Sequence, residues 1–300
     1  MTEIEFHSNI DIDRIKWDKC ISQAPNSRIY ALSWYLDIIF PNWSGLVYGN
    51  YAFVMPVLMS KKWGIKYSLQ TAYAQQHGIF PNPENEITET FINKFSTLAS
   101  YIKIALNADN DLSEGPFEVT KKSNFVLSLD HDYENLRKAF SKHNKRYTNK
   151  AEKEVSILDQ TTIDQYIKLK EKVAGNFIDR SLLDKLKLIL LKCRDRKILE
   201  IKGAYDTHNE LCAAAVYIHE RKRITYLNGV STDNGKQLRA MYAIFNEFLK
   251  QHAGSKKILD FEGSSIPGVA RFFKGFGAHD EQFSIIHQNR LPFILKWLVK

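Results

Sequence analysis

The chain has 300 residues, of which 44% are hydrophobic and 25% charged, and a formal net charge of +8. This balance excludes a disordered or collagen-like chain and provides the core of one large or two medium domains. The three cysteines, Cys20, Cys193 and Cys212, lie far apart without a C-x-x-C pair. Their placement excludes a disulfide scaffold and a zinc cluster, and it indicates the reducing cytoplasm.

The positive charge favours polyanionic partners such as tRNA, nucleotide-sugar diphosphates, coenzyme A or an anionic membrane surface. A basic, soluble surface without such a partner explains the same charge. The N-terminal stretch carries acids and no long apolar run, so we expect no secretory signal. No stretch reaches the length of a membrane span.

The first half is predicted to alternate helices with short strands. Apolar residues at helical spacing predict helices over residues 29–40, stopped by Pro41, and over residues 87–106. Short apolar segments predict strands at residues 44–48, 51–59 and 67–69, with a hairpin turn at 61–66. The intervening TAYAQQHGIFPNP is expected to be an exposed functional loop or a structural turn.

The second half follows a polar stretch, residues 107–122, which we interpret as the approach to a linker. Helices are predicted at residues 133–154, 161–173, 181–193 and 235–252, and strands at 125–129, 198–205, 211–219, 223–230, 258–261 and 283–287. Residues 29–106 and 181–252 share one order of elements, which indicates a topological repeat. We therefore expect two domains, residues 1–122 and 123–300, with mixed sheets rather than a doubly wound parallel sheet.

The densest signals lie in residues 258–278, ILDFEGSSIPGVARFFKGFGA. An apolar strand runs into glycine and serine, and Pro267 then opens a short helix that carries cations and aromatics. Asp260 and Glu262 are two apart on the predicted strand, so their carboxylates are expected on one face. Such a pair raises one pKa, which suits a general base acting on an amine. For Asp260 we favour a structural role, in which it holds a backbone group or an arginine.

This segment resembles the closing motif of the FemAB-like aminoacyltransferases. The family has the GNAT-type N-acyltransferase fold, usually as two tandem GNAT-like domains, so the resemblance implies an α/β chain with mixed sheets. It implies a degenerate N-terminal domain with an acceptor groove, and a C-terminal domain that carries LDFEGS…RFFKGFG. It further implies a bacterial transferase acting on an aminoacyl-tRNA and a peptidoglycan precursor. Lys274 lies one residue later than the family lysine.

The resemblance implies catalytic roles for Lys274 and Arg271. Transfer of an acyl group from an ester to an amine builds negative charge on the carbonyl oxygen, which a neighbouring cation stabilises. Phe273 and Phe276 of the same segment are expected to contact the substrate. The alternative is that FFKGFG packs as an aromatic plug while Lys274 extends to water.

In the first half, YAQQHGI is similar to a family segment near the acceptor groove. The resemblance implies that Tyr73, Gln75 and Gln76 hydrogen-bond a sugar or a peptide. His77 is either a base or, as is commoner for a lone loop histidine, a surface residue.

Two further groups are candidates for substrate binding in the second half. Arg146 and Lys150 continue a row of cations at four-residue spacing, which resembles a basic segment of the family. The row either contacts successive phosphates or is a solvated helix face. Tyr226 and Asn228 lie two apart on a strand and are expected to face one groove.

No cofactor and no metal site are expected. The chain lacks HExxH, Walker, G-x-S-x-G and G-x-G-x-x-G motifs, and its nine histidines show no ligand spacing. The acyl donor is a co-substrate, either aminoacyl-tRNA or acyl-CoA. The loop from Asp233 to Arg239 has one glycine, and an acid where the pyrophosphate of coenzyme A would bind, which argues against acyl-CoA. Alternatively, Asp233 or Asn234 caps a helix.

Three functions remain open. The first is FemAB-like transfer of an aminoacyl or other acyl group onto an amine of a cell-wall precursor or related acceptor. The second is a CoA-dependent N-acyltransferase, and the third is a non-catalytic module that binds carbohydrate or peptide. DNA is not expected as a partner. The C-terminal RLPFILKWLVK either touches a membrane peripherally or packs as a final helix, which we favour.

Overall fold

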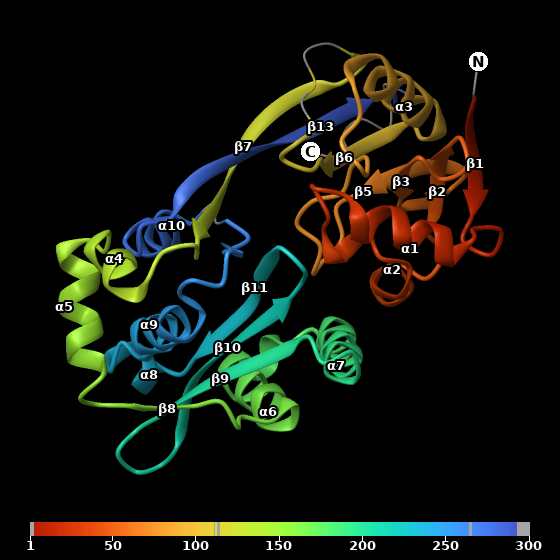
Figure 1. Ribbon diagram of the computed structural model, residues 1–300. Helices are drawn as coiled ribbons and strands as arrows, with labels where there is room; N and C mark the ends of the chain where they lie inside the picture. Colours follow the sequence, from red (N-terminus) through yellow and green to blue (C-terminus); the bar gives the residue numbers. More distant parts are fainter. Residues whose placement is uncertain (1–2, 111, 113–114, 264–265, 293–300) are drawn as a thin grey trace. The chain divides into compact units, whose positions relative to one another are not determined.

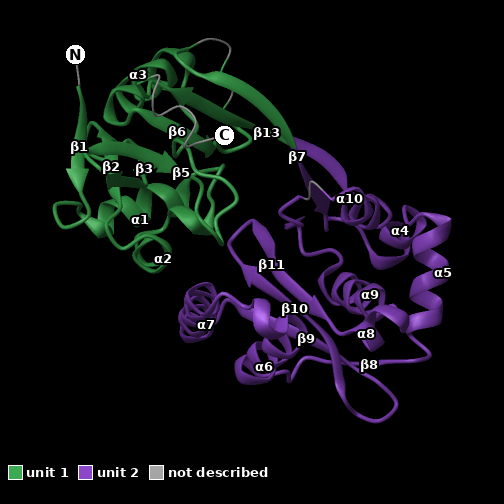
Figure 2. Ribbon diagram, turned by 180° about the vertical axis from the view of Figure 1, so that it is seen from behind, with its two compact units in different colours: residues 1–122, 282–300 green, residues 123–281 purple. Residues whose placement is uncertain are grey.

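The computed structural model describes residues 3–110, 112, 115–263 and 266–292, and the chain divides into two units (Figures 1 and 2). Unit 1 comprises residues 1–122 and 282–300, and unit 2 comprises residues 123–281. The division after residue 122 falls where the sequence places it. Residues from 282 onward, which we expected in the second domain, group with unit 1 because strand β13 (His279–Asn289) pairs with unit 1 strand β6 (Tyr101–Ala105).

Unit 1 contains two sets of paired strands. Strands β1, β2 and β3 form an antiparallel sheet, and β4, β5, β6 and β13 are successive neighbours in a second sheet. The apolar side of α3 packs into the core of this unit through Phe91, Ile92 and Phe95. The elements are β1 (Ile4–Ser8), α1 (Arg14–Gln23), α2 (Ser33–Ile39), β2 (Ser44–Tyr48), β3 (Phe53–Val57), β4 (Met59–Lys62), β5 (Ile65–Leu69), α3 (Asn85–Leu98) and β6.

The helix predicted over residues 87–106 is wrong in its second part. Helix α3 ends at Leu98, and residues 101–105 form β6, which pairs in parallel with β5. The apolar residues of YIKIA suit a helix face and a buried strand equally well, and the neighbouring strand decides between the two. The helix predicted over residues 29–40 is likewise divided, into a 3-10 turn (Ile29–Ala31) and α2.

Unit 2 is built on a sheet with the strand order β7-β12-β11-β10-β9-β8, in which β11 and β12 are parallel. Figure 1 shows α9 on one face of this sheet and α6 on the other. The elements are β7 (Glu118–Ser128), α4 (Tyr133–Lys138), α5 (Lys142–Ala151), β8 (Ser156–Leu158), α6 (Ile163–Ala174), α7 (Arg180–Asp195), β9 (Leu199–Tyr205), β10 (Leu211–His219), β11 (Arg223–Ser231), α8 (Asp233–Gln237), α9 (Ala240–His252), β12 (Ile258–Asp260) and α10 (Pro267–Lys274).

Aromatic side chains fill the space between α9, α10 and the sheet of unit 2. The fully buried ring of Phe245 on α9 lies 4.9 Å from Tyr226 of β11, 5.4 Å from Phe261 and 5.6 Å from Phe276, measured between centroids. Such pairs add about 0.5–1.5 kcal/mol each beyond the area they bury. This aromatic core fixes α10 against α9.

The helix predicted over residues 235–252 is two helices. Arg239 has a φ of +59°, in the left-handed region, and separates α8 from α9. A residue in this conformation cannot continue a right-handed helix, so α8 ends before Arg239 and a separate helix, α9, begins after it.

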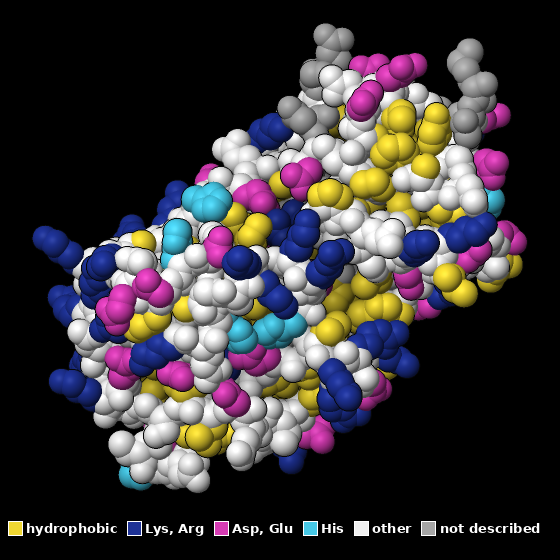
Figure 3. Space-filling view, viewed as in Figure 1, with side chains coloured by type: hydrophobic (Ala, Val, Ile, Leu, Met, Phe, Trp, Pro, Cys, Tyr) yellow, Lys and Arg dark blue, Asp and Glu magenta, His cyan; other side chains and the backbone are white. Residues whose placement is uncertain are grey.

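None of the helices in the described ranges is both long and apolar enough to cross a membrane. The surface in Figure 3 carries lysine and arginine side chains interspersed with acidic ones. The C-terminal segment that we considered for membrane contact, residues 290–300, lies outside the described residues from position 293 onward.

Candidate active site

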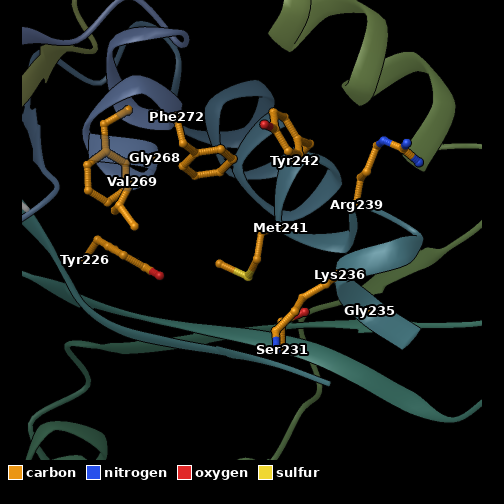
Figure 4. Close-up of a pocket in the computed structure, with 11 residues that line it drawn as sticks. Tyr226, Ser231, Gly235, Lys236, Arg239, Met241, Tyr242, Gly268, Val269 and Phe272 are labelled. Carbon is orange, nitrogen blue, oxygen red and sulfur yellow. The ribbon is translucent and has the colours of Figure 1, made fainter. Parts of the chain in front are cut away.

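A pocket of about 310 Å³ opens in unit 2 between β11 and the three helices α8, α9 and α10 (Figure 4). Strand β12 pairs with β11 over three residues, Arg223–Thr225 against Ile258–Asp260, whereas β11 continues to Ser231. Beyond Thr225 the side of β11 towards β12 is therefore left open. The described lining residues are Tyr226, Ser231, Gly235, Lys236, Arg239, Met241, Tyr242, Gly268, Val269, Phe272 and Phe273.

Tyr226 places a neutral phenol in this pocket. Burial, followed by the negative charge of nearby Glu262, raises the pKa of Tyr226, so the hydroxyl keeps its proton. The hydroxyl lies over Gly229, where a Cβ atom would come within 2.0 Å of it. The pocket thus contains a hydrogen-bond donor, Tyr226, and the carboxylate of Glu262, which is not one of the described lining residues, lies close enough to raise the pKa of this phenol.

Asp260 serves the structure and does not line the pocket. Its buried carboxylate accepts hydrogen bonds from Arg223 at 2.6 Å, Asn124 at 3.0 Å and the backbone N–H of Glu262 at 2.9 Å. Arg223 also pairs with Glu281 at 3.1 Å. Burial opposes the charge on Arg223, but the two carboxylates outweigh it and raise the pKa of the guanidinium. The arginine partner favoured from the sequence is thus present.

The expectation that Asp260 and Glu262 share one strand face is wrong. Strand β12 ends at Asp260, and Glu262 has a φ of +58°, so strand alternation does not reach it. Because its carboxylate is held by an arginine, Asp260 is not suited to act as a general base.

Tyr226 and Asn228 do not face one groove as predicted. Tyr226 packs on Phe245 and Phe273, whereas the Asn228 side chain accepts hydrogen bonds from Tyr166 and Lys170 of α6, each at 2.7 Å. The reason is a β-bulge. Tyr217 pairs with Tyr226 and Val216 with Asn228, which leaves Leu227 as an extra residue that reverses the alternation.

The aromatics of FFKGFG pack as the aromatic plug that the sequence offered as the alternative. Phe276 is fully buried and belongs to the core, so the expectation that it contacts a substrate is wrong. Phe273 is buried and is one of the residues that line the pocket. Lys274 and Arg271 are exposed on α10, and the ammonium of Lys274 lies 5.2 Å from the ring centroid of Phe125. Their catalytic roles stay predictions.

The basic row on α5 carries an aromatic residue that joins it to α9. Arg146 and Lys150 are exposed, and Lys150 lies 3.8 Å from Glu154. The guanidinium carbons of Arg146 and Arg239 lie 5.0 Å and 4.4 Å from the ring centroid of Tyr147. Hydrogen bonds from these two arginines lower the pKa of the Tyr147 phenol.

The loop before α8 is capped and packed by contacts within the chain. Thr232, not Asp233 or Asn234, caps the helix, because its hydroxyl accepts the N–H of Gly235 at 3.0 Å. A Cβ on Gly235 would lie 2.3 Å from the carbonyl oxygen of Cys212, so this glycine is required for packing on β10. Asp233 pairs with Lys236 at 2.8 Å.

The predicted acceptor-binding loop of unit 1 is mostly engaged in its own structure. Gln76 is fully buried and accepts the N–H of Ala108 at 2.9 Å, so it holds the backbone and is not available to a substrate. Its amide also donates to Gln75 at 2.9 Å, and the carbonyl of Tyr73 accepts the hydroxyl of Tyr35 at 2.5 Å. The side chains of Tyr73 and Gln75 remain partly exposed.

His77 is buried and not a surface residue. Neither ring nitrogen has a hydrogen-bond partner among the described residues. Desolvation by burial lowers the pKa of His77 from 6.5 to about 4, so the ring is neutral at pH 7.

Most residues of the pocket were not predicted from the sequence. Of the predicted site residues, Tyr226 and Phe273 are among the described lining residues. The sequence contained a signal for two others, the cations Lys236 and Arg239 in DNGKQLR, and Tyr147, which contacts Arg239, lies within the basic run KHNKRYTNK. Aromatic residues among cations are a feature of nucleotide-binding surfaces.

No family model and no curated protein sequence matches the chain. Among solved structures it is similar to FemX, with a TM-score of 0.67 and 12% identity over 96% of this chain and 98% of that one. It is also similar to L-PGS from Bacillus licheniformis, with a TM-score of 0.52 and 10% identity over 85% of each chain. A third similar structure is a GCN5-related N-acetyltransferase from Sphaerobacter thermophilus, with a TM-score of 0.51 and 11% identity over 96% of each chain. The predicted mixed α/β fold with tandem GNAT-like domains is confirmed.

Replacing Asp260 tests its structural role. We expect Asp260→Ala to lower the free energy of unfolding by about 3–5 kcal/mol, because it leaves Arg223 buried with one partner fewer. The matched variant Glu262→Ala should change it by less than about 1 kcal/mol. Urea denaturation followed by fluorescence measures both. Equal stability of Asp260→Ala and the wild type would contradict the structural role.

The burial of His77 predicts a pH-dependent loss of stability. Its folded pKa of about 4 lies below the unfolded value of 6.5, so unfolding takes up a proton between these values. Stability is therefore lost as the pH falls below 6.5. At about 1.4 kcal/mol for each pH unit, the wild type should lose about 2 kcal/mol more than His77→Phe between pH 7 and pH 5. Urea denaturation at both pH values measures this.

The exposed His208 supplies the control for this comparison. His208→Gln should keep the pH dependence of the wild type. An identical loss of stability in the wild type and in His77→Phe would show that His77 is protonated in the folded protein.

Proposed function

We propose that this protein is an acyltransferase that moves an aminoacyl or other acyl group onto an amine of a cell-wall precursor or related acceptor. The observation that carries the proposal is the pocket beside the open part of β11, with the neutral phenol of Tyr226 and the nearby carboxylate of Glu262. The fold shared with FemX and with a GCN5-related N-acetyltransferase supports the same class of reaction.

The chemistry requires a proton to leave the attacking amine and another to reach the leaving group. In the proposed reaction, Glu262 takes the proton of the amine, and the amine attacks the carbonyl carbon of the bound donor. Glu262 returns a proton to the leaving oxygen or sulfur. The phenol of Tyr226 keeps its own proton and donates a hydrogen bond to the developing oxyanion. No covalent enzyme intermediate is needed, because a positioned amine attacks directly. Lys274 is proposed to add positive charge.

The cluster of Arg146, Tyr147 and Arg239 supports a donor that carries a phosphorylated nucleotide. Arg239 also lines the pocket, so the cluster continues from its wall. Guanidinium groups bind phosphate, and the ring of Tyr242, which lines the pocket and contacts Tyr147 edge to face at 5.3 Å, provides an aromatic side chain for contact with a base. Aminoacyl-tRNA and acyl-CoA both end in an adenine nucleotide, so either fits this chemistry.

Between these donors, aminoacyl-tRNA is favoured. The capping of Gly235 by Thr232 and the acid at Asp233 remove the anion site that the pyrophosphate of coenzyme A needs at a helix N-terminus. A CoA-dependent N-acyltransferase is the second candidate, because Lys236 lines the pocket close to this loop.

Calorimetric titration separates the donors. We expect an aminoacylated tRNA to bind with a salt-dependent affinity and acetyl-CoA to give no heat. Arg239→Ala should weaken the tRNA complex at least tenfold, because it removes one cation and one wall of the pocket. Arg194→Ala, which removes an exposed arginine from α7, should leave the affinity unchanged. Tight binding of acetyl-CoA and CoA would instead establish the CoA-dependent enzyme.

Substitutions at Tyr226 and Lys274 test the chemical step. Transfer of a labelled amino acid from tRNA to a muropeptide precursor should fall about 100-fold in Tyr226→Phe, because the hydrogen bond to the developing oxyanion is lost. Lys274→Ala should lower transfer by a similar factor without unfolding the protein. Tyr205→Phe, which removes a hydroxyl outside the pocket, should retain activity. Wild-type turnover in Tyr226→Phe or Lys274→Ala would eliminate the role assigned to that residue.

A further inference from the structure

Two histidines of unit 2 converge on one carboxylate oxygen, away from the pocket. Glu200 lies on β9, His219 is the last residue of β10, and His252 is the last residue of α9. The Nε2 atoms of His219 and His252 lie 2.6 Å and 2.9 Å from Oε2 of Glu200. One nitrogen from each histidine and one oxygen of Glu200 all lie within 4.8 Å of one another.

The carboxylate of Glu200 is oriented by a second layer of contacts. Its other oxygen, Oε1, lies 3.1 Å from the ammonium of Lys202, which is fully buried. Lys202 is itself held by Asp159 at 2.6 Å and by Gln251 at 2.5 Å. Residues that hold a ligating carboxylate in this way are typical of protein metal sites, because they fix which oxygen faces the ion.

The charge and the exposure of the cluster suit a cation that enters from solvent. Glu200 and Asp159 contribute two negative charges against the single positive charge of Lys202, which leaves one net negative charge beside the two histidines. The side chains of Glu200, His219 and His252 are 17%, 22% and 22% exposed. An ion can therefore reach them, and a water molecule can complete its coordination.

We propose that Glu200, His219 and His252 form a binding site for a divalent transition-metal ion of the zinc type. Two imidazole nitrogens and one carboxylate oxygen are the ligands that Zn²⁺ takes in many proteins, with a water in the fourth position. Bonds of about 2.0–2.1 Å at tetrahedral angles place ligand atoms about 3.3 Å apart. The two histidine nitrogens, now 2.6 Å and 2.9 Å from the Glu200 oxygen, therefore move away from it by about half an ångström on binding. The positions of the histidines at the ends of β10 and α9 permit this movement.

The site would stabilise the fold and take no part in acyl transfer. His252 lies ten residues beyond Tyr242 of the pocket, which is about 15 Å along α9. A bound ion joins the end of α9 to the first half of β9 and the end of β10. Metal binding should therefore raise the stability of unit 2, and the proposal does not depend on the proposed function.

The test uses the full-length, tag-free protein after treatment with a chelator and its removal. Titration with Zn²⁺ at pH 7.5 should show one site, and Co²⁺ should give the visible absorption of a tetrahedral complex. An excess of Zn²⁺ should raise the Tm. His219→Gln and His252→Gln should each weaken Zn²⁺ binding at least tenfold and abolish the Tm shift.

His208→Gln removes an exposed histidine outside the cluster and should bind Zn²⁺ like the wild type. The proposal is overturned if the wild type binds no Zn²⁺. It is overturned equally if the double variant of His219 and His252, shown to be folded by circular dichroism, keeps the affinity and the Tm shift of the wild type.

Discussion

The buried ion pair between Arg223 and Asp260 is the contact on which the geometry of unit 2 depends. It joins β11 to β12, while Asn124 of β7 and Glu281 of β13 complete the cluster from two further strands. Removing one partner of such a pair costs far more than the pair contributes, because the remaining charge stays buried. The pair therefore holds β11 and β12 together over three residues and fixes where β12 stops.

The pocket follows from that stopping point. Because β12 ends at Asp260 and β11 continues, the open side of β11 is covered by helices instead of by a strand. Arg239, in the left-handed conformation, separates α8 from α9 at this opening. Its side chain lines the pocket and also contacts the ring of Tyr147. Phe245 of α9 lies at the centre of the aromatic core. It contacts Tyr226 of β11 and Phe273 of α10, and these contacts set the spacing between the two helices and the strand.

Much of the secondary structure could be predicted from local patterns. Strands β9, β10 and β11 lie within a residue of their predicted ranges, because their apolar runs are bounded by turn residues. Local patterns failed where a distant partner decides, as in β6, whose residues suit a helix until β5 pairs with them. They failed again at Tyr226 and Asn228, since the bulge at Leu227 appears in the pairing with β10 and not in the sequence of β11.

The sequence by itself determined the mixed α/β class, the division after residue 122 and the segment of residues 258–278 as the centre of unit 2. Periodicity and turn residues carry that information, since they act over a few neighbouring positions. The tertiary structure alone decided the role of each side chain in that segment. Asp260 became structural because Arg223 lies beside it, and the phenylalanines became core because α9 covers them. Contacts between residues of different strands and helices form only in the folded chain. These contacts decide whether a charged residue is a buried ion-pair partner or part of a site.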